Sequence, residues 1–151
     1  MTAPESPDAG PRGAAVLRIS RAALADMAAH ARLEAPRECC GLLVGSEGRV
    51  EESVRTPNLE PGVSRFLVDP AAHFALMKRL RGSGREIVGA YHSHPRSEPQ
   101  PSPSDIAGAV SDDFLCVIVS LVGEGGPATR AYRFRNGEAQ EVRVLEVGGT
   151  A

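Results

Sequence analysis

Apolar residues recur along the chain with two different spacings, which separate strands from helices. Alternating or continuous apolar runs bounded by Gly, Pro, Asn or Ser predict strands. The expected strands are 14–19, 39–46, 49–56, 86–92, 114–122, 129–134 and 138–145. Apolar positions three or four residues apart, behind a residue that can cap, predict helices. The expected helices are 21–34, 70–81 and 104–110.

The first two helices carry capping signals at their starts. Ser20 can cap the first helix, because its hydroxyl can accept from a free backbone N–H of the first turn. Asp69 followed by Pro70 begins the second, because proline is tolerated at the first helical position. The apolar stripe of this second helix consists of Phe74, Met77 and Leu80.

Two strand signals fix the fold class. Segment 114–122 is continuously apolar, which predicts a central strand buried on both faces. The pair Asn136-Gly137 lies between two alternating runs and predicts a two-residue hairpin turn. The sequence therefore predicts an α/β fold with a central mixed β-sheet flanked by about three helices.

Length and composition suit one domain. The chain has 151 residues, and its hydrophobic fraction of 42% is enough for a core. Its net charge of −2 gives no indication of nucleic-acid binding. No apolar run approaches the ~20 residues that a membrane span needs, and the N-terminus lacks a secretory signal pattern. We expect a flexible tail over 1–13, the domain over 14–147 and a frayed end over 148–151.

The cysteines predict a reducing compartment. There are three, and Cys39 and Cys40 are neighbours, which point to opposite faces of a strand and cannot easily bridge one another. We therefore expect a cytoplasmic protein without a disulfide framework. One of these two thiols should face the core, and the other can approach the candidate site at Glu38.

The richest chemistry lies in 92–105, which reads HSHPRSEPQPSPSD. His92 and His94 are two residues apart at the end of a strand, so both imidazoles lie on one face. Asp105 begins the following helix and can reach back across a loop stiffened by four prolines. Two histidines and one carboxylate suit Zn²⁺ and leave a fourth position for water, as in catalytic sites.

A base and an oxyanion donor complete the hypothesis. Glu38 precedes a buried strand, where partial desolvation would raise its basicity for taking a proton from water. Ser102 is three residues before Asp105, and its hydroxyl could donate to the oxyanion formed when a carbonyl is attacked. Ser102-Pro103-Ser104-Asp105 is also a good capping box, and the two roles are compatible.

These five residues resemble the JAMM (MPN-plus) metalloprotease family. That pattern is a distant Glu, then His-x-His, seven residues, Ser, two residues and Asp, which Glu38, His92, His94, Ser102 and Asp105 match. The surrounding sequences PRECCGLLVG, RFLVDP and IVGAYHSHP are also similar. The resemblance implies a cytidine-deaminase-like fold, zinc bound by both histidines and the aspartate, Glu38 as general base and Ser102 as oxyanion stabiliser.

The resemblance also implies a substrate class. Family members cleave peptide or isopeptide bonds after the C-terminal glycines of ubiquitin or ubiquitin-like proteins. This chain lacks the long insertions of the deubiquitinating members and is more similar to short prokaryotic members, which process ubiquitin-like sulfur-carrier proteins. We therefore expect such a carrier as partner and substrate, with no nucleic-acid or membrane partner, and the sequence leaves a homodimer open.

Other interpretations remain beside this one. Glu38 could simply pair with Arg37 or Arg65. A metal-free scaffold would have no need of this residue set, whereas a zinc amidase acting on a small metabolite would use the same ligands. A zinc deaminase is disfavoured, because the later Pro-Cys-x-x-Cys of that chemistry is absent.

Overall fold

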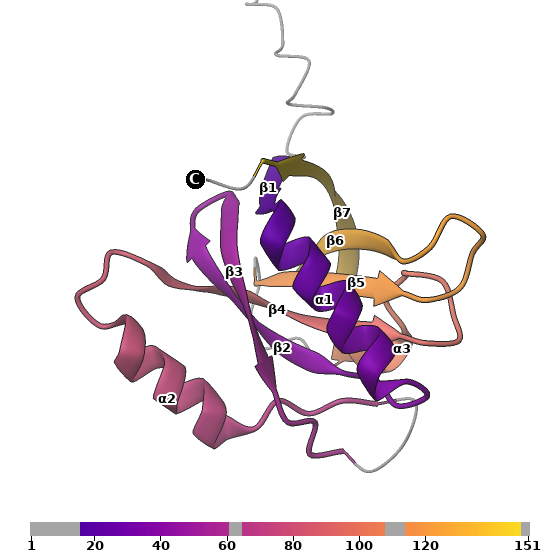
Figure 1. Ribbon diagram of the computed structural model, residues 1–151, viewed down its shortest axis with the longest axis horizontal. Helices are drawn as coiled ribbons and strands as arrows, with labels where there is room; N and C mark the ends of the chain where they lie inside the picture. Colours follow the sequence, from indigo (N-terminus) through magenta and orange to yellow (C-terminus); the bar gives the residue numbers. More distant parts are fainter. Residues whose placement is uncertain (1–15, 61–64, 108–113, 149–151) are drawn as a thin grey trace, which may run out of the picture.

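Residues 16–60, 65–107 and 114–148 are described by the computed structural model, and they form seven strands and three helices (Figure 1). The strands are β1 (Val16–Ser20), β2 (Cys40–Ser46), β3 (Arg49–Thr56), β4 (Glu86–His94), β5 (Leu115–Ser120), β6 (Ala128–Arg135) and β7 (Glu138–Val147). The helices are α1 (Arg21–Glu34), α2 (Pro70–Leu80) and α3 (Pro103–Ala107).

The strands form one closed mixed sheet in the order β1-β3-β2-β4-β5-β6-β7. Closure depends on β1, which pairs in parallel with both β3 and β7. The pair β4–β5 is also parallel, and the remaining neighbours are antiparallel. The α/β class, with a mixed sheet and three helices, is confirmed at this level.

Helix α1 lies across the sheet and supplies the main core (Figure 1). Its start is as expected, because the Ala23 amide donates to the Ser20 hydroxyl over 3.1 Å. Met27 and Ala31 are fully buried in an apolar cluster to which all seven strands contribute. Two smaller clusters contain other apolar side chains of the sheet strands, one with those of α2 and one with Ile106 of α3. Burial on both sides of the sheet therefore fixes its strands between packed layers.

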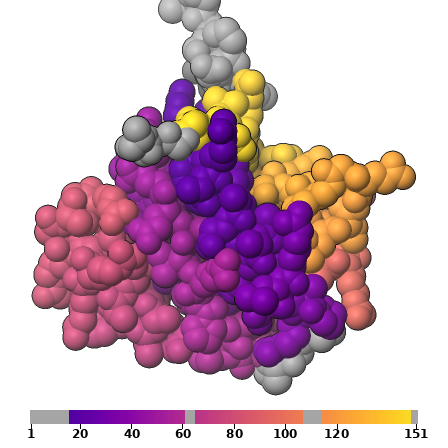
Figure 2. Space-filling model, viewed as in Figure 1, coloured from indigo at the N-terminus to yellow at the C-terminus, as the bar shows by residue number. Residues whose placement is uncertain are grey.

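The apolar stripe expected on α2 is wrong in part. Leu80 is buried, but Phe74 and Met77 are 58% and 55% exposed. The helix instead buries Leu76 together with Leu80 in a cluster with Leu42 and other apolar residues of β2, β3 and β4. These two leucines are four residues apart, so they form a narrow contact line along one side of the helix. The helix lies at one side of the molecule (Figure 2), and its other large apolar side chains stay exposed.

The end of β4 extends further than the sequence predicts. The expected strand stops at 92, whereas β4 continues to His94. The reason is its neighbour β5, which pairs in parallel with β4 as far as His94 opposite Ser120. Strand β5 is itself the predicted central strand, with Ile118 and its two neighbours Val117 and Val119 buried on opposite faces. Both histidines are therefore held in regular strand backbone.

The turn predicted between β6 and β7 is confirmed. Asn136 and Gly137 have φ of 53° and 76°, the left-handed conformation that a two-residue hairpin turn requires. Several other expectations lie outside the described residues, namely the tail 1–13, the start of the first strand at 14–15, part of the third helix at 108–110 and the end at 149–151. Of the helices within the described ranges, none is long and apolar enough to cross a membrane.

Candidate metal centre

His92 and His94 lie on one face of β4 at its carboxyl end. Their side chains are 1% and 5% exposed, and their strand lies between β2 and β5 in the sheet. The two Nε2 atoms are 3.2 Å apart. The prediction that the two imidazoles lie together on one face of a strand is therefore confirmed.

A carboxylate oxygen completes a triangle with these nitrogens. Oδ2 of Asp105 lies 3.2 Å from Nε2 of His92 and 3.2 Å from Nε2 of His94. Ligand atoms that bind zinc tetrahedrally at about 2.0 Å lie about 3.3 Å from one another. The three atoms thus have the spacing that a single tetrahedral metal ion needs.

The capping box around α3 fixes the carboxylate. The Ser102 amide donates to Oδ2 of Asp105 over 2.8 Å, and the Asp105 amide donates to the Ser102 hydroxyl over 3.0 Å. This reciprocal pair confirms the predicted capping box. The Ser102 hydroxyl also shares a hydrogen bond with Ser104 over 3.1 Å, so its oxyanion role stays a prediction.

The tautomer of His94 is set by a backbone carbonyl. Its Nδ1 lies 2.9 Å from the carbonyl oxygen of Glu98, which can only accept. Nδ1 therefore carries the hydrogen, and in the neutral ring Nε2 presents its lone pair to the triangle. A carbonyl behind a ligating histidine is a usual support of metal sites.

The charges at the triangle perturb its protonation. Burial raises the pKa of Asp105, but hydrogen bonds to both histidines outweigh burial and hold that pKa far below its usual range. Burial lowers the pKa of His92 despite Asp105. For His94 burial also lowers the pKa, but Asp105 and the Glu98 carbonyl outweigh it and the net change is upward. An ionised carboxylate beside two imidazoles suits a divalent cation.

Glu38 is a second carboxylate at the same place. It is 7% exposed and lies two residues before β2, with one carboxylate oxygen within 4.8 Å of the ligating atoms of both histidines. Burial raises its pKa to about 7, while the charge of His94 lowers it and that of Asp105 raises it. Within the described ranges, its Oε1 is buried without a hydrogen-bond partner.

The alternative in which Glu38 pairs with an arginine is not what the structure has. The Arg37 guanidinium donates to backbone carbonyls of Glu60 over 2.8 Å and Asn58 over 3.5 Å. Among the ion pairs of residues 16–60, 65–107 and 114–148, Glu38 takes no part. A buried, unpaired carboxylate beside two histidines carries a cost in stability that a purely structural role would not explain.

Two residues that the sequence analysis missed form a wall of the site. Phe66 stacks on His92 with ring centroids 4.1 Å apart and planes 16° apart. Asn58 holds the segment that carries Phe66: its Oδ1 accepts from Leu67 N and its Nδ2 donates to the carbonyl of Arg65. Residue spacing in the sequence could not have identified Phe66 or Asn58 as site residues. Their contacts at the site are with residues that only the fold brings close to them.

The same asparagine also holds the backbone of Glu38. Nδ2 of Asn58 donates to the Glu38 carbonyl over 2.9 Å, and Oδ1 also accepts from the Glu60 amide over 2.9 Å. All four hydrogen bonds that an amide side chain can make are therefore used. Asn58 links the general-base candidate to the aromatic wall over His92.

The adjacent cysteines divide as expected. Cys39 belongs to the main core. Cys40 lies opposite His92 in the β2–β4 pairing, on the side of the site, with Sγ 3.5 Å from the Thr56 hydroxyl. Burial raises the pKa of the Cys39 thiol to about 11 and also raises that of Cys40, so both are protonated near neutral pH. Neither is activated as a nucleophile.

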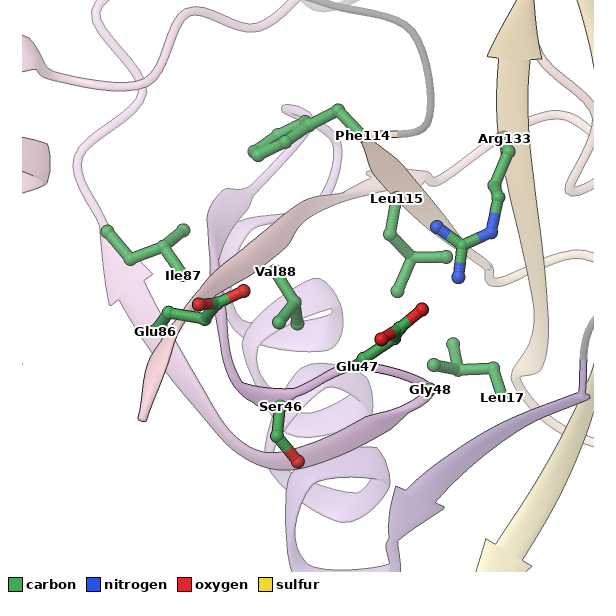
Figure 3. Close-up of a pocket in the computed structure, with 10 residues that line it drawn as sticks. All are labelled: Leu17, Ser46, Glu47, Gly48, Glu86, Ile87, Val88, Phe114, Leu115 and Arg133. Carbon is green, nitrogen blue, oxygen red and sulfur yellow. The ribbon is translucent and has the colours of Figure 1, made fainter. Parts of the chain in front are cut away.

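A cavity of about 320 Å³ lies at the other end of β4 (Figure 3). Its walls come from β1, the β2–β3 turn, the starts of β4 and β5, and β6. The lining residues are Leu17, Ser46, Glu47, Gly48, Glu86, Ile87, Val88, Phe114, Leu115 and Arg133. Glu86 and His92 are six residues apart on one strand, or about 20 Å. This cavity is therefore separate from the histidines.

Fold and site together define a compact α/β domain with a candidate metal centre at the end of a central strand (Figure 1). Residues 20–135 match the family described as prokaryotic homologs of the JAB domain. The chain belongs to this family, and the resemblance inferred from the sequence is confirmed.

Named relatives agree with this assignment. A probable TtuB-protein conjugate cleaving protease of Thermus thermophilus is 38% identical over 92 residues, which is 60% of this chain and 62% of that protein. A CysO-cysteine peptidase of Mycobacterium tuberculosis is 31% identical over 140 residues, or 89% of this chain and 96% of that protein. A desampylase of Haloferax volcanii is 32% identical over 84% of this chain and 95% of that protein.

Solved structures share the fold. A protein of Desulfitobacterium hafniense superimposes with a TM-score of 0.80 at 26% identity, covering 87% of this chain and 93% of that one. A JAB1/MPN domain protein of Archaeoglobus fulgidus gives a TM-score of 0.57 at 23% identity, covering 86% and 98%. The latter likeness concerns the fold alone.

Proposed function

We propose that this chain is a zinc-dependent peptidase that cleaves after the C-terminal glycines of a ubiquitin-like sulfur-carrier protein. The family and its relatives, which are named as peptidases and desampylases, support hydrolase activity on ubiquitin-like conjugates. The observation that carries the proposal is the triangle of ligand atoms with 3.2 Å sides beside the buried, unpartnered carboxylate of Glu38.

His92, His94 and Asp105 would hold the zinc. Two neutral imidazoles and an ionised carboxylate are the ligand set that zinc takes in catalytic sites. Asp105 rather than Glu38 is the third ligand in this proposal, because its Oδ2 is 3.2 Å from both nitrogens and fixed by the Ser102 amide. When bound, zinc lowers the pKa of water and polarises a carbonyl group.

Glu38 would move the proton. Its pKa of about 7 places its carboxylate where it can take a proton near neutral pH and give it up again to the leaving amine. Its free Oε1 leaves a position for that proton. In this proposal the Ser102 hydroxyl, which accepts from the Asp105 amide, would donate its hydrogen to the developing oxyanion.

The proposed substrate class is taken from the substrates that the relatives are named for. One of the relatives is named for TtuB-protein conjugates and another for CysO-cysteine. A carrier tail that ends in glycines would fit, because glycine has no side chain to obstruct an approach to the metal past the Phe66 ring, which stacks on His92. We further propose a cytoplasmic location, no nucleic-acid or membrane partner, and a cytidine-deaminase-like layering of the fold.

The test combines zinc content with cleavage. Wild-type protein, His92→Ala and Glu38→Gln are measured for bound zinc and for cleavage of ubiquitin-like carriers extended at the C-terminus by cysteine or a short peptide. His73→Ala, on α2, is the matched control for loss of a histidine away from the triangle. We expect about one zinc per chain in the wild type, His73→Ala and Glu38→Gln, and none in His92→Ala.

Activity should separate the roles. Only the wild type and His73→Ala should cleave, because Glu38→Gln keeps the metal and loses the proton acceptor. A wild type that binds no zinc after reconstitution would refute the proposal and favour a scaffold. Zinc binding without cleavage of any carrier would refute the substrate assignment and favour an amidase acting on small molecules.

A further inference from the structure

The loop between the second histidine and Asp105 is held by three strands at three consecutive carbonyl groups. The carbonyl of Ser97 accepts from the Ser120 hydroxyl on β5 over 2.6 Å. The carbonyl of Glu98 accepts from Nδ1 of His94 on β4, and that of Pro99 accepts from the Tyr132 hydroxyl on β6 over 2.7 Å. We call these three hydrogen bonds the loop clamp.

The donors of the clamp are fixed themselves. Ser120 is fully buried, and its hydroxyl oxygen accepts from the Val122 amide over 3.2 Å, which orients its hydrogen toward Ser97. Tyr132 is 6% exposed, and its ring packs in an apolar cluster with Ile118. Because these hydroxyls are held in the sheet, they can fix the position of the loop more precisely than hydroxyls on exposed turns could.

Asp105 depends on this loop for its place. Helix α3 has five residues, which is too short to be stable alone, so its position must come from tertiary contacts. One contact is Ile106, which packs against the cluster that contains Tyr132. The other is the chain from Pro99 onward, which the clamp fixes six residues before Asp105. Tyr132 therefore contributes to both contacts.

We infer that Tyr132 and Ser120 are positioning residues for the metal centre, which hold Asp105 at bonding distance of a metal shared with the histidines. This inference rests on the proposed zinc site, and it adds two residues to it that touch neither metal nor substrate. Partners behind metal ligands change metal affinity roughly ten- to a hundredfold when they are removed. The loop clamp should have the same effect on metal affinity, although its hydroxyls hold the loop before Asp105 rather than the ligand itself.

Tyr132→Phe and Ser120→Ala remove one hydroxyl each and keep the packing of the ring and strand. The matched control is Ser53→Ala, because the Ser53 hydroxyl also donates to a carbonyl, that of Ala23, in a helix contact away from the site. Each protein is titrated with zinc against a competing chelator, and the urea midpoint of the metal-free form is measured in parallel. The zinc dissociation constant is the readout that a merely structural role would not move.

We expect Tyr132→Phe and Ser120→Ala each to raise the zinc dissociation constant roughly tenfold or more, and Ser53→Ala to leave it unchanged. With zinc saturating, kcat should return toward the wild-type value. The inference is overturned if both variants keep their zinc affinity within about twofold of the wild type, whether or not their urea midpoints fall. The two variants are independent, so one that fails to fold leaves the other to decide. A wild type that binds no zinc would instead overturn the zinc site itself, and the inference with it.

Discussion

Burial of Glu38 should destabilise the metal-free protein in a pH-dependent way. The carboxyl has an ordinary pKa of 4.5, which burial raises to about 7 in the folded chain. Between these values the folded state binds more protons than the unfolded state, so the free energy of unfolding falls as pH rises. At 1.36 kcal/mol per pKa unit, the full cost above pH 7 is about 3 kcal/mol.

Glu38→Gln removes this cost, because a buried amide has no charge to desolvate. The variant should therefore be more stable than the wild type by about 3 kcal/mol at pH 8, and by only about 1 kcal/mol at pH 5. For a chain of this size, the first difference corresponds to a rise in Tm of roughly 6–12 °C. The wild type and the variant are compared by urea unfolding with a chelator present at both pH values.

The control is Glu124→Gln, which removes a carboxylate from an exposed turn between β5 and β6. It should change the free energy of unfolding little at either pH, because an exposed carboxylate is solvated in both states. The reasoning is refuted if Glu38→Gln gives no stabilisation at pH 8. It is refuted equally if the gain is the same at pH 5, because a titrating carboxyl cannot be its cause.

Three further predictions concern packing, hydrogen bonding and metal. Gly41→Ala should lower the free energy of unfolding in urea by about 1–3 kcal/mol, because a Cβ there would overlap the Tyr91 ring. Gly125→Ala places its Cβ in open space and should not lower it, so equal effects of the two substitutions would contradict this prediction. Asn58→Ala should lower kcat more than it raises KM, since it frees the backbone of Glu38, and an unchanged kcat would count against it. Zinc at a hundred times its dissociation constant should stabilise the wild type by about 2.7 kcal/mol against a chelated sample, and no rise in Tm would contradict the metal site.

Local chemistry was readable from the sequence. Ser20 and Asp69 cap their helices, and Asn136-Gly137 forms its turn, because each depends on neighbours only a few residues away. The His92–His94 pair was readable for the same reason, since alternate residues of a strand share a face. Asp105 could be placed because a stiff loop and a capping box limit where its carboxylate can go.

Features that depend on distant segments were not readable. The sheet closes because β1 pairs with β7, more than a hundred residues later, and no local pattern encodes that choice. The predicted buried side of α2 was wrong in part, because helical spacing alone does not tell which of two rows of apolar residues packs on the sheet. Asn58 and Tyr132 look like ordinary loop and strand residues until the fold brings their partners to them.

In the proposed reaction, Glu38 and a metal held by His92, His94 and Asp105 would add water to the last glycyl carbonyl of a carrier. The most direct measurement is mass spectrometry of a carrier–cysteine adduct treated with the zinc-loaded protein in oxygen-18-labelled water. We predict release of cysteine, and a carrier whose new terminal glycine carboxylate holds one labelled oxygen, with neither product formed by Glu38→Gln. An intact adduct, a cut elsewhere in the carrier or equal cleavage by Glu38→Gln would contradict the account.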